Sequence, residues 1–242
     1  AIKAGINPRK IVFSGVGKTT NELSYAIDKK ILLINAESKS EIKEIERIAK
    51  LKKKKVEIGI RLNPNTDAKT LSQISTGKKE NKFGVNTKTF LEITKYCINS
   101  KNLILKCLSV HIGSQILDHK PYEKMLKALS KTINKTNHTF EFIDLGGGMG
   151  ISYDHNNKNL NYQKYNNAIN KFLKNHDSKI IFEPGRSIIG DTAALVCKII
   201  YIKENEKKNF IILDAAMNDL IRPALYGAIH KTLPVIKKKT IS

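Results

Sequence analysis

The sequence contains no tryptophan, few arginines, three cysteines and no long apolar run. Cys97, Cys107 and Cys197 are widely spaced and odd in number, which argues against a disulfide framework and leaves no thiol pair for a metal. The apolar runs are far shorter than the roughly 20 residues that cross a bilayer. At 40% hydrophobic residues, the chain is rich enough in apolar side chains to fold. We therefore expect a cytoplasmic protein with no metal site, no signal peptide and no membrane contact.

Arginine accounts for only five of the 43 basic residues, although the net charge is +21. The lysines lie in helix-like and linker runs such as 52–55 and 237–239, without the interleaved aromatic residues of a single-strand nucleic-acid site. A nucleic-acid surface is therefore the less favoured interpretation, and we expect a solvated face and no nucleic-acid partner. Because arginine is scarce here, an arginine within a glycine motif is expected to bind through its planar guanidinium fork.

Short β-rich runs alternate with amphipathic stretches over the first 190 residues. In the stretch 40–50, Ile42, Ile45 and Ile48 recur at helical spacing behind Ser40, which we expect to cap the helix. Six such repeats predict an α/β protein with a parallel sheet or a (β/α) barrel. The expected strands are 10–14, 31–35, 56–62, 108–112, 140–145 and 179–183, and the expected helices are 21–29, 40–50, 87–99, 122–132 and 161–175.

The ends of these expected strands favour the barrel. Small, polar or charged residues follow each strand directly, as at Ser14, His111 and Glu183. A barrel carries its active site on the rim formed by those ends, whereas a doubly wound sheet concentrates it at one switch point. Residues 1–190 are thus predicted to form an incomplete TIM-like barrel lacking its first units. A hairpin-like pattern, with strands over 194–201 and 210–213, predicts that residues 191–242 begin a β-rich C-terminal domain.

Two glycine segments differ from the standard nucleotide-binding motifs. The segment GVGKT at 15–19 resembles the end of a P-loop, but Val12 stands where that motif needs glycine. The run GGGMG at 146–150 lacks the spacing of a dinucleotide fingerprint. Its consecutive N–H groups can approach a phosphate closely, and a tight turn explains the glycines equally well.

The segment EPGR at 183–186 combines an acid and an arginine at the end of a strand. Glu183 is expected to be a buried acid, which needs a cationic partner such as a protonated ring nitrogen. Arg186 can bind phosphate or carboxylate bidentately. A structural Glu–Arg pair at a turn is the alternative.

Two other pairs of residues also suggest binding. His111 places a titratable ring at a strand end, and Ser114 supplies a hydroxyl three residues later. Arg222 and Tyr226 set a guanidinium and a phenol four residues apart, which suits a carboxylate. A structural histidine and an ordinary buried turn are the respective alternatives.

Pyridoxal phosphate chemistry requires a ring that stacks on the cofactor, groups that hold its phosphate, an acid beside its ring nitrogen and arginines for anionic groups. The candidate residues together supply all of these. The sequence resembles the diaminopimelate decarboxylases, a family of fold-type III, alanine-racemase-like pyridoxal-phosphate-dependent enzymes. The matching segments run almost end to end: 11–19 (IVFSGVGKT), 35–38, 61–64, 75–84 (STGKKENKFG), 111–115 (HIGSQ), 144–150, 183–186 and 214–226 (DAAMNDLIRPALY).

The resemblance implies roles for the candidate residues around pyridoxal 5'-phosphate. His111 stacks on the pyridine ring, Glu183 keeps the ring nitrogen protonated, and Ser114 and Gly148 hold the phosphate with the backbone at 185–186. The cofactor-binding residues implied in this way are His111, Ser114, Gly148, Glu183, Pro184, Gly185 and Arg186.

The resemblance also implies a substrate and an assembly. Arg186, Arg222 and Tyr226 bind the carboxylates of meso-2,6-diaminopimelate, which is decarboxylated to L-lysine and CO2 in the last step of lysine biosynthesis. The implied assembly of the full-length protein is a cytoplasmic homodimer. The rivals within this fold are decarboxylases of arginine, ornithine or carboxynorspermidine, and the two arginines with Tyr226 favour a substrate with a distal carboxylate.

Two functional groups of the family have no counterpart here. The Schiff-base lysine is expected upstream of this chain, and Lys3, whose surroundings superficially resemble that site, is assigned no catalytic role. The proton-donor cysteine of a Cys-Glu motif is expected downstream of Ser242, and none of the three cysteines stands in that context. The chain is therefore expected to contain no catalytic residue of its own and to be incomplete for catalysis.

Overall fold

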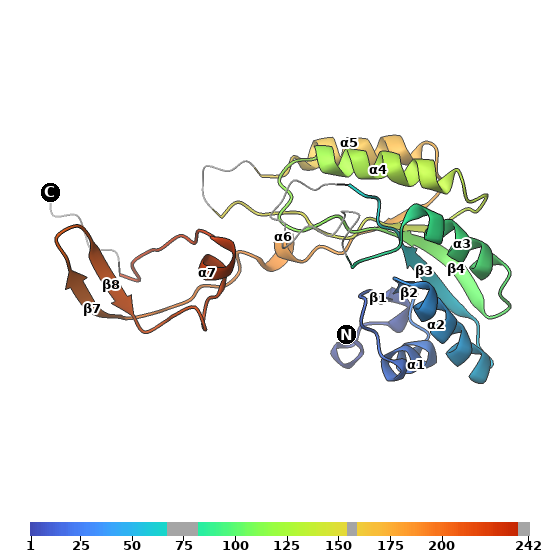
Figure 1. Cartoon of the computed structure of the whole chain (residues 1–242), viewed down its shortest axis with the longest axis horizontal. Coiled ribbons are helices and arrows are strands. Elements are labelled where there is room, and N and C mark those ends of the chain that lie inside the picture. The colour runs from blue at the N-terminus through green and yellow to red at the C-terminus, as the bar shows by residue number, and fades with distance from the viewer. Residues whose placement is uncertain (67–81, 154–158, 237–242) are drawn as a thin grey trace.

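A curved parallel sheet with helices on its outer side forms most of the molecule, and a β-hairpin projects from it (Figure 1). The computed structural model describes residues 1–66, 82–153 and 159–236. Within these residues the sheet has six strands in sequential order, β1 to β6, and every neighbouring pair is parallel. This arrangement confirms the predicted incomplete (β/α) barrel.

The strands are short, and β2 and β3 are almost entirely buried. Their register places residues of equal depth side by side, so that Asn35 lies beside Gly59 and Ser109 beside Asp144. The strands are β1 Val12–Phe13, β2 Leu33–Ala36, β3 Val56–Arg61, β4 Leu103–Ser109, β5 Phe142–Asp144 and β6 Lys179–Ile181.

The helices between the strands each bury one apolar face. In α2, Ile42, Ile45 and Ile48 are almost completely buried against the sheet, as the periodicity predicts. A capping box at Thr19 and Glu22 begins α1, because each side chain accepts a backbone hydrogen bond of the other residue. The helices are α1 Thr20–Lys29, α2 Lys39–Leu51, α3 Thr87–Ile98, α4 Lys120–Ile133, α5 Tyr162–Leu173 and the single-turn α6 Arg186–Ile189.

Two local predictions were wrong. The fourth strand was expected over 108–112, but β4 begins at Leu103, and its register against β3 shifts between Ile58 and Gly59. Val110 and Ile112 lie beyond the end of the strand but are buried. Because both are apolar, the sequence pattern alone predicts that the strand includes them. Ser38 rather than Ser40 caps α2: its hydroxyl accepts the N–H of Glu41.

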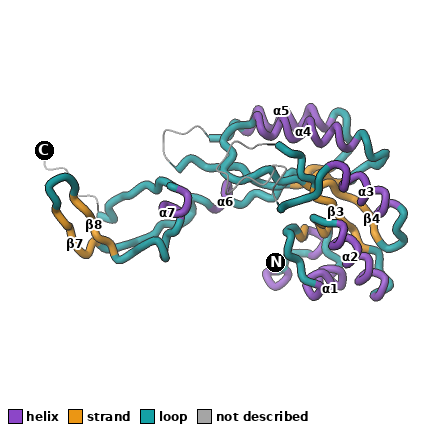
Figure 2. Tube along the Cα trace, in the orientation of Figure 1, coloured by secondary structure: helices purple, strands orange, loops and turns teal. Residues whose placement is uncertain are grey.

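The C-terminal part has a different architecture. Strands β7 (Ile199–Glu204) and β8 (Asn209–Leu213) pair antiparallel, which confirms the predicted hairpin, although β7 begins five residues later than expected. Helix α7 (Arg222–Tyr226) follows between loops (Figure 2). Every residue of β7 and β8 is exposed, including large apolar side chains. An isolated two-stranded hairpin is marginally stable, so these strands need a further apolar surface to pack against.

The described residues also include the cysteines and the segments considered for metal binding and membrane crossing. Cys97 and Cys107 are buried free thiols and Cys197 is half-buried. No group of three metal-ligating side chains occurs in the described ranges. None of the helices in these ranges is long and apolar enough to cross a membrane.

Candidate functional site

The C-terminal ends of the parallel strands bring the predicted residues to one rim of the sheet. Ser14 follows β1, His111 follows β4, Gly146 follows β5 and Glu183 follows β6. Their loops are tied together by the backbone: Gly146 accepts the N–H of Glu183, and Asp144 accepts the N–H of Val110. Residues that are far apart in the sequence thus form one continuous surface.

The glycine run is required by the packing of three loops. A Cβ on Gly147 would lie 2.2 Å from the carbonyl oxygen of Glu183, and one on Gly148 would lie 2.3 Å from that of Gly113. Gly148 also has a φ of +91° and accepts the N–H of Ile116. Close contact between backbones is therefore one reason for glycine at both of these positions.

Gly185 is different, because a Cβ there would meet no atom within 4 Å. It precedes α6, whose first backbone N–H groups have no partner within the helix. The space beside Gly185 therefore lies between an exposed helix start and the loop that carries Ser114, which Arg186 contacts.

His111 is held in a single orientation. The N–H of Gly147 donates to its Nδ1 at 3.1 Å, so the ring proton of the neutral form is on Nε2. Desolvation, assisted by the charge of Arg61, lowers the pKa of His111 to about 4. The ring is therefore neutral at pH 7, and a neutral ring can stack on another ring without bringing a charge.

Glu183 is half-buried, in contrast to the expected buried acid, and it has no cationic partner among the described residues. Its Oε1 accepts the hydroxyl proton of Ser14 at 2.7 Å. Its negative charge raises the pKa of a second, buried carboxyl, that of Asp144. A carboxylate placed beside a second acid, with one oxygen unbound, suits a cationic group supplied from outside the protein.

Asp144 is completely buried at the end of β5. It accepts hydrogen bonds from Asn35 Nδ2 at 2.8 Å, from Ser109 Oγ at 3.1 Å and from the N–H of Gly146 at 2.9 Å. Burial and the negative charge of Glu183 nevertheless raise its pKa to about 7. Asp144 therefore holds a proton part of the time near neutral pH.

Two buried ion pairs support the rim. Arg61 donates to Glu37 at 2.9 Å, and the second oxygen of Glu37 accepts the N–H of Gly84. Lys18, whose side chain is 1% exposed, pairs with Glu41 at 2.7 Å. The lysine of the P-loop-like segment therefore ties its loop to α2, which agrees with the rejection of a nucleotide motif.

Arg186 and Arg222 both contact Tyr153, a tyrosine that was not among the predicted site residues. Arg186 donates through Nη1 to Tyr153 Oη at 2.5 Å and through Nε to Ser114 Oγ at 3.3 Å. Arg222 lies over the Tyr153 ring, 4.4 Å from its centre, and His230 contacts the edge of the same ring. Tyr153 follows the glycine run by three residues, which is the only sequence feature that could have drawn attention to it.

The remaining predicted residues occupy less defined surroundings. Tyr226 lies on α7, one turn after Arg222, and is half-buried. Pro184 is half-buried between Glu183 and Gly185. Of the matching segment 75–84, residues 75–81 lie outside the described part of the chain.

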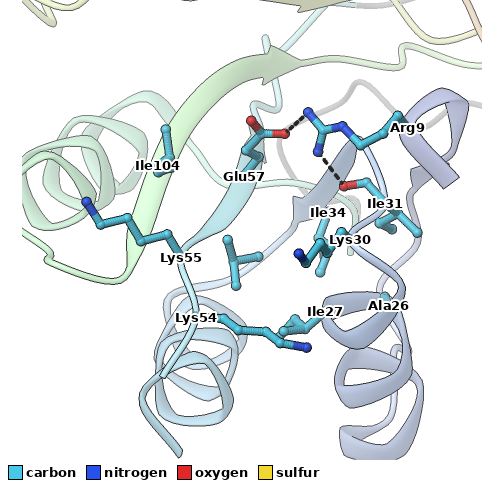
Figure 3. Close-up of a pocket in the computed structure, with 11 residues that line it drawn as sticks. Arg9, Ala26, Ile27, Lys30, Ile31, Ile34, Lys54, Lys55, Glu57 and Ile104 are labelled. Carbon is cyan, nitrogen blue, oxygen red and sulfur yellow. Dashed lines mark hydrogen bonds and ion pairs between the residues drawn. The ribbon is translucent and has the colours of Figure 1, made fainter. Parts of the chain in front are cut away.

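A cavity of about 350 Å³ lies elsewhere, at the opposite ends of the strands (Figure 3). It is lined by residues that precede β2 and β3, including Ile31 and Lys55, and it is closed on one side by the ion pair of Arg9 with Glu57. It belongs to the end of the barrel that carries stability rather than the rim.

Residues 1–190 match the family described as pyridoxal-dependent decarboxylase, pyridoxal binding domain. The chain belongs to this family. Similar relatives of this chain are named diaminopimelate decarboxylase. The protein of Aquifex aeolicus is 40% identical over 242 residues, and the match covers 99% of this chain and 58% of the Aquifex protein. That of Helicobacter pylori is 44% identical over 234 residues, covering 95% of this chain and 57% of its own.

The solved structures give the same picture. The crystal structure of diaminopimelate decarboxylase from Helicobacter pylori complexed with L-lysine is similar with a TM-score of 0.90 at 43% identity, covering 95% of this chain and 58% of the other. The arginine decarboxylase of Paramecium bursaria Chlorella virus, bound to agmatine, shares the fold with a TM-score of 0.71 at 21% identity. The match covers 89% of this chain and 56% of the viral one. The chain spans less than three fifths of the length of these relatives.

Proposed function

We propose that this chain is the cofactor-binding part of a diaminopimelate decarboxylase, which converts meso-2,6-diaminopimelate to L-lysine and CO2. The observation that carries the proposal is identity of 40–44% with diaminopimelate decarboxylases along nearly the whole chain, against 21% for an arginine decarboxylase of the same fold. The pairing of Arg186 and Arg222 on one ring adds a physical reason, because two guanidinium groups suit a substrate with an additional carboxylate.

The residues of the rim fit pyridoxal phosphate. Glu183 lacks a cationic partner among the described residues, and the protonated pyridine nitrogen would supply one. The neutral ring of His111 would stack on the pyridine ring. The open space at Gly185, the start of α6 and the hydroxyl of Ser114 would receive the phosphate. Once bound, the cofactor supplies an electron sink for the electrons released when the carboxylate leaves.

The chain's own residues then have distinct tasks. Glu183 holds a proton on the ring nitrogen, which keeps the cofactor electron-withdrawing. Gly147 holds His111 in the neutral, stacking form through its N–H. Arg186, Arg222 and Tyr226 bind the substrate carboxylates and fix which end of the molecule faces the cofactor. In the net reaction the bond from the α-carbon to the carboxylate breaks, CO2 leaves and a proton is added to that carbon.

The domain division and assembly are part of the proposal. Residues 1–190 form the cofactor-binding barrel and residues 191–242 begin a β-rich domain, whose exposed strands β7 and β8 need an apolar surface to cover them. We propose a cytoplasmic homodimer for the full-length protein, with the Schiff-base lysine and the proton-donor cysteine supplied from outside these 242 residues.

The test is decarboxylation by the full-length protein loaded with pyridoxal phosphate. CO2 release should be measured from meso-diaminopimelate, ornithine, arginine and carboxynorspermidine under identical conditions. We expect turnover of meso-diaminopimelate well above that of the substrates without a distal carboxylate. Turnover of ornithine but not of diaminopimelate would overturn the proposal.

A further inference from the structure

A chain of hydrogen bonds leads from the buried interior of the barrel to Glu183. Ser14 donates its hydroxyl proton to Glu183 Oε1 at 2.7 Å. The same hydroxyl oxygen accepts from Asn35 Nδ2 at 3.2 Å, and Asn35 Nδ2 also donates to Asp144 Oδ2 at 2.8 Å. The chain of contacts from Glu183 through Ser14 and Asn35 to Asp144 therefore links the C-terminal ends of four strands, β1, β2, β5 and β6.

The direction of these hydrogen bonds is fixed by the number of protons available. Ser14 has one hydroxyl proton, and Glu183 as a carboxylate can only accept it. The atom of Asn35 that faces Ser14 must therefore be the nitrogen, since the serine has no second proton to donate. The two protons of that nitrogen are directed at Ser14 and Asp144, which holds the amide in one orientation.

The orientation of the Asn35 amide leaves one of its polar atoms without a hydrogen bond. Asn35 is completely buried, and its Oδ1 has no hydrogen-bond partner among the described residues. That oxygen occupies the place of a side chain on Gly59, where a Cβ would lie 2.0 Å away. A buried polar atom without a partner costs about 1–3 kcal/mol. The amide is therefore poorly explained as a stabilising element of the core, and a role in organising its other neighbours accounts for it better.

The other oxygen of Glu183, Oε2, has no hydrogen-bond partner in the parts of the chain that the structure describes. It is not among the buried unpartnered atoms, so it is accessible from the rim. One oxygen is thus held from inside the barrel and the other is available to a ligand.

We propose that Ser14 and Asn35 are positioning residues for Glu183: the serine hydroxyl, oriented by the asparagine amide, fixes one carboxylate oxygen and leaves the other for a cationic ring nitrogen. This inference rests on the proposed function, because it assigns the ring to the cofactor. Their assigned role acts through Glu183, which Ser14 contacts directly and Asn35 contacts through Ser14.

The experiment compares Ser14→Ala with Ser109→Ala in the full-length holoenzyme. Ser109 also donates to Asp144, at 3.1 Å, but it makes no contact with Glu183, so it controls for loss of a hydroxyl in the same network. The measurements are the dissociation constant of pyridoxal phosphate, the circular dichroism of the bound cofactor, kcat and KM. Urea unfolding of each variant checks the fold.

In Ser14→Ala we expect the cofactor to bind about five- to tenfold more weakly, which corresponds to the loss of one ordinary hydrogen bond. We also expect a weaker dichroism band, because the ring is no longer held at one angle, and a lower kcat with little change in KM. Ser109→Ala should match the wild type in all four. Ser14→Thr, which keeps the hydroxyl, should restore the dichroism band.

Several results would overturn the inference. Equal dichroism and affinity in Ser14→Ala and the wild type would show that the hydroxyl does not position Glu183. Loss of the band in both Ser14→Ala and Ser14→Thr, or an equal loss in Ser109→Ala, would show that the change is a general disturbance. A wild-type protein that binds no pyridoxal phosphate overturns the proposed function, and this inference with it.

Discussion

At the rim of the barrel, Asp144 and Glu183 are held by hydrogen bonds from neighbouring strand ends, whereas Arg222 contacts the barrel through the ring of Tyr153. The first group lies among buried residues whose spacing is set by the sheet register. The second lies on a short helix after an exposed hairpin. The carboxylates of Asp144 and Glu183 are therefore positioned by the strand ends of the sheet. The arginine group, Arg186 and Arg222 around Tyr153, is positioned by contacts between a loop and two short helices.

The largest effect is expected from Glu183→Gln in the full-length protein. The amide keeps the shape but cannot hold a proton on the ring nitrogen, so kcat should fall about 10²- to 10³-fold, as for loss of one electrostatic stabiliser. Steady-state kinetics with meso-diaminopimelate measure this. Glu141→Gln is the matched control, because Glu141 pairs with Lys106 away from the rim. Equal activity of the two variants would remove Glu183 from the site.

The arginine group should respond differently, through substrate binding. Arg222→Lys keeps the charge but loses the planar fork, so kcat/KM for meso-diaminopimelate should fall about tenfold, mainly through KM. Arg47→Lys serves as control, since Arg47 pairs with Glu44 on the surface of α2. If kcat falls while KM stays unchanged, Arg222 acts on the chemical step, and the contrast between the two groups fails.

The rigidity of the inner rim can be tested by adding a methyl group to a glycine. Gly147→Ala should lower the free energy of unfolding by about 2 kcal/mol, because its Cβ would lie 2.2 Å from the backbone oxygen of Glu183. Gly185→Ala should change it by less than about 0.5 kcal/mol, because no atom lies within 4 Å. Urea unfolding monitored by far-UV circular dichroism distinguishes them. Similar losses would mean that the inner loops yield as easily as the outer one.

The smallest net effect is expected in the pH dependence of the wild-type protein's stability, because two buried groups act in opposite directions. The pKa of Asp144 is raised to about 7 in the folded protein, so its contribution is present below pH 4 and is lost as the pH rises toward 7. The pKa of His111 is lowered to about 4, so stability from that group increases between pH 4 and 6.5. The two slopes oppose each other, and each is at most about 1.4 kcal/mol per pH unit.

Removing one of the opposing groups should reveal the other. Asp144→Asn should make stability rise more steeply with pH between 4 and 6.5, as measured by urea midpoints across that range. His111→Gln should produce the reverse, a fall in stability over the same range. An unchanged profile in Asp144→Asn would mean that Asp144 is ionised throughout and that burial does not raise its pKa.

Much of the fold could be predicted from the sequence because each helix carries its own periodic apolar face. The observed α1, α2 and α3 differ from the predicted ranges by one residue at most at each end. β4 was misplaced because buried residues continue past the strand into the loop at Val110 and Ile112. Burial there comes from the neighbouring loops, which the local sequence does not encode.

For the site, the sequence indicated which residues end the strands but not which of them contact one another. His111 and Glu183 stand in recognisable segments, whereas Ser14, Asn35 and Asp144 converge only because parallel strands place their ends side by side. Tyr153 was missed for a related reason: the residues that define its role, Arg186 and Arg222, lie 33 and 69 positions away.

By itself the sequence determined that the chain is a repeated strand–helix structure, which residues its strand ends would present, and that its arginines rather than its many lysines are informative. These follow from local periodicity and residue chemistry. Only the tertiary structure decided that Glu183 accepts a hydrogen bond from Ser14, and that Gly147 and Gly148 lie against the backbone of neighbouring loops. Both depend on distances between segments that are remote in the chain, and those distances are set by the register and curvature of the sheet.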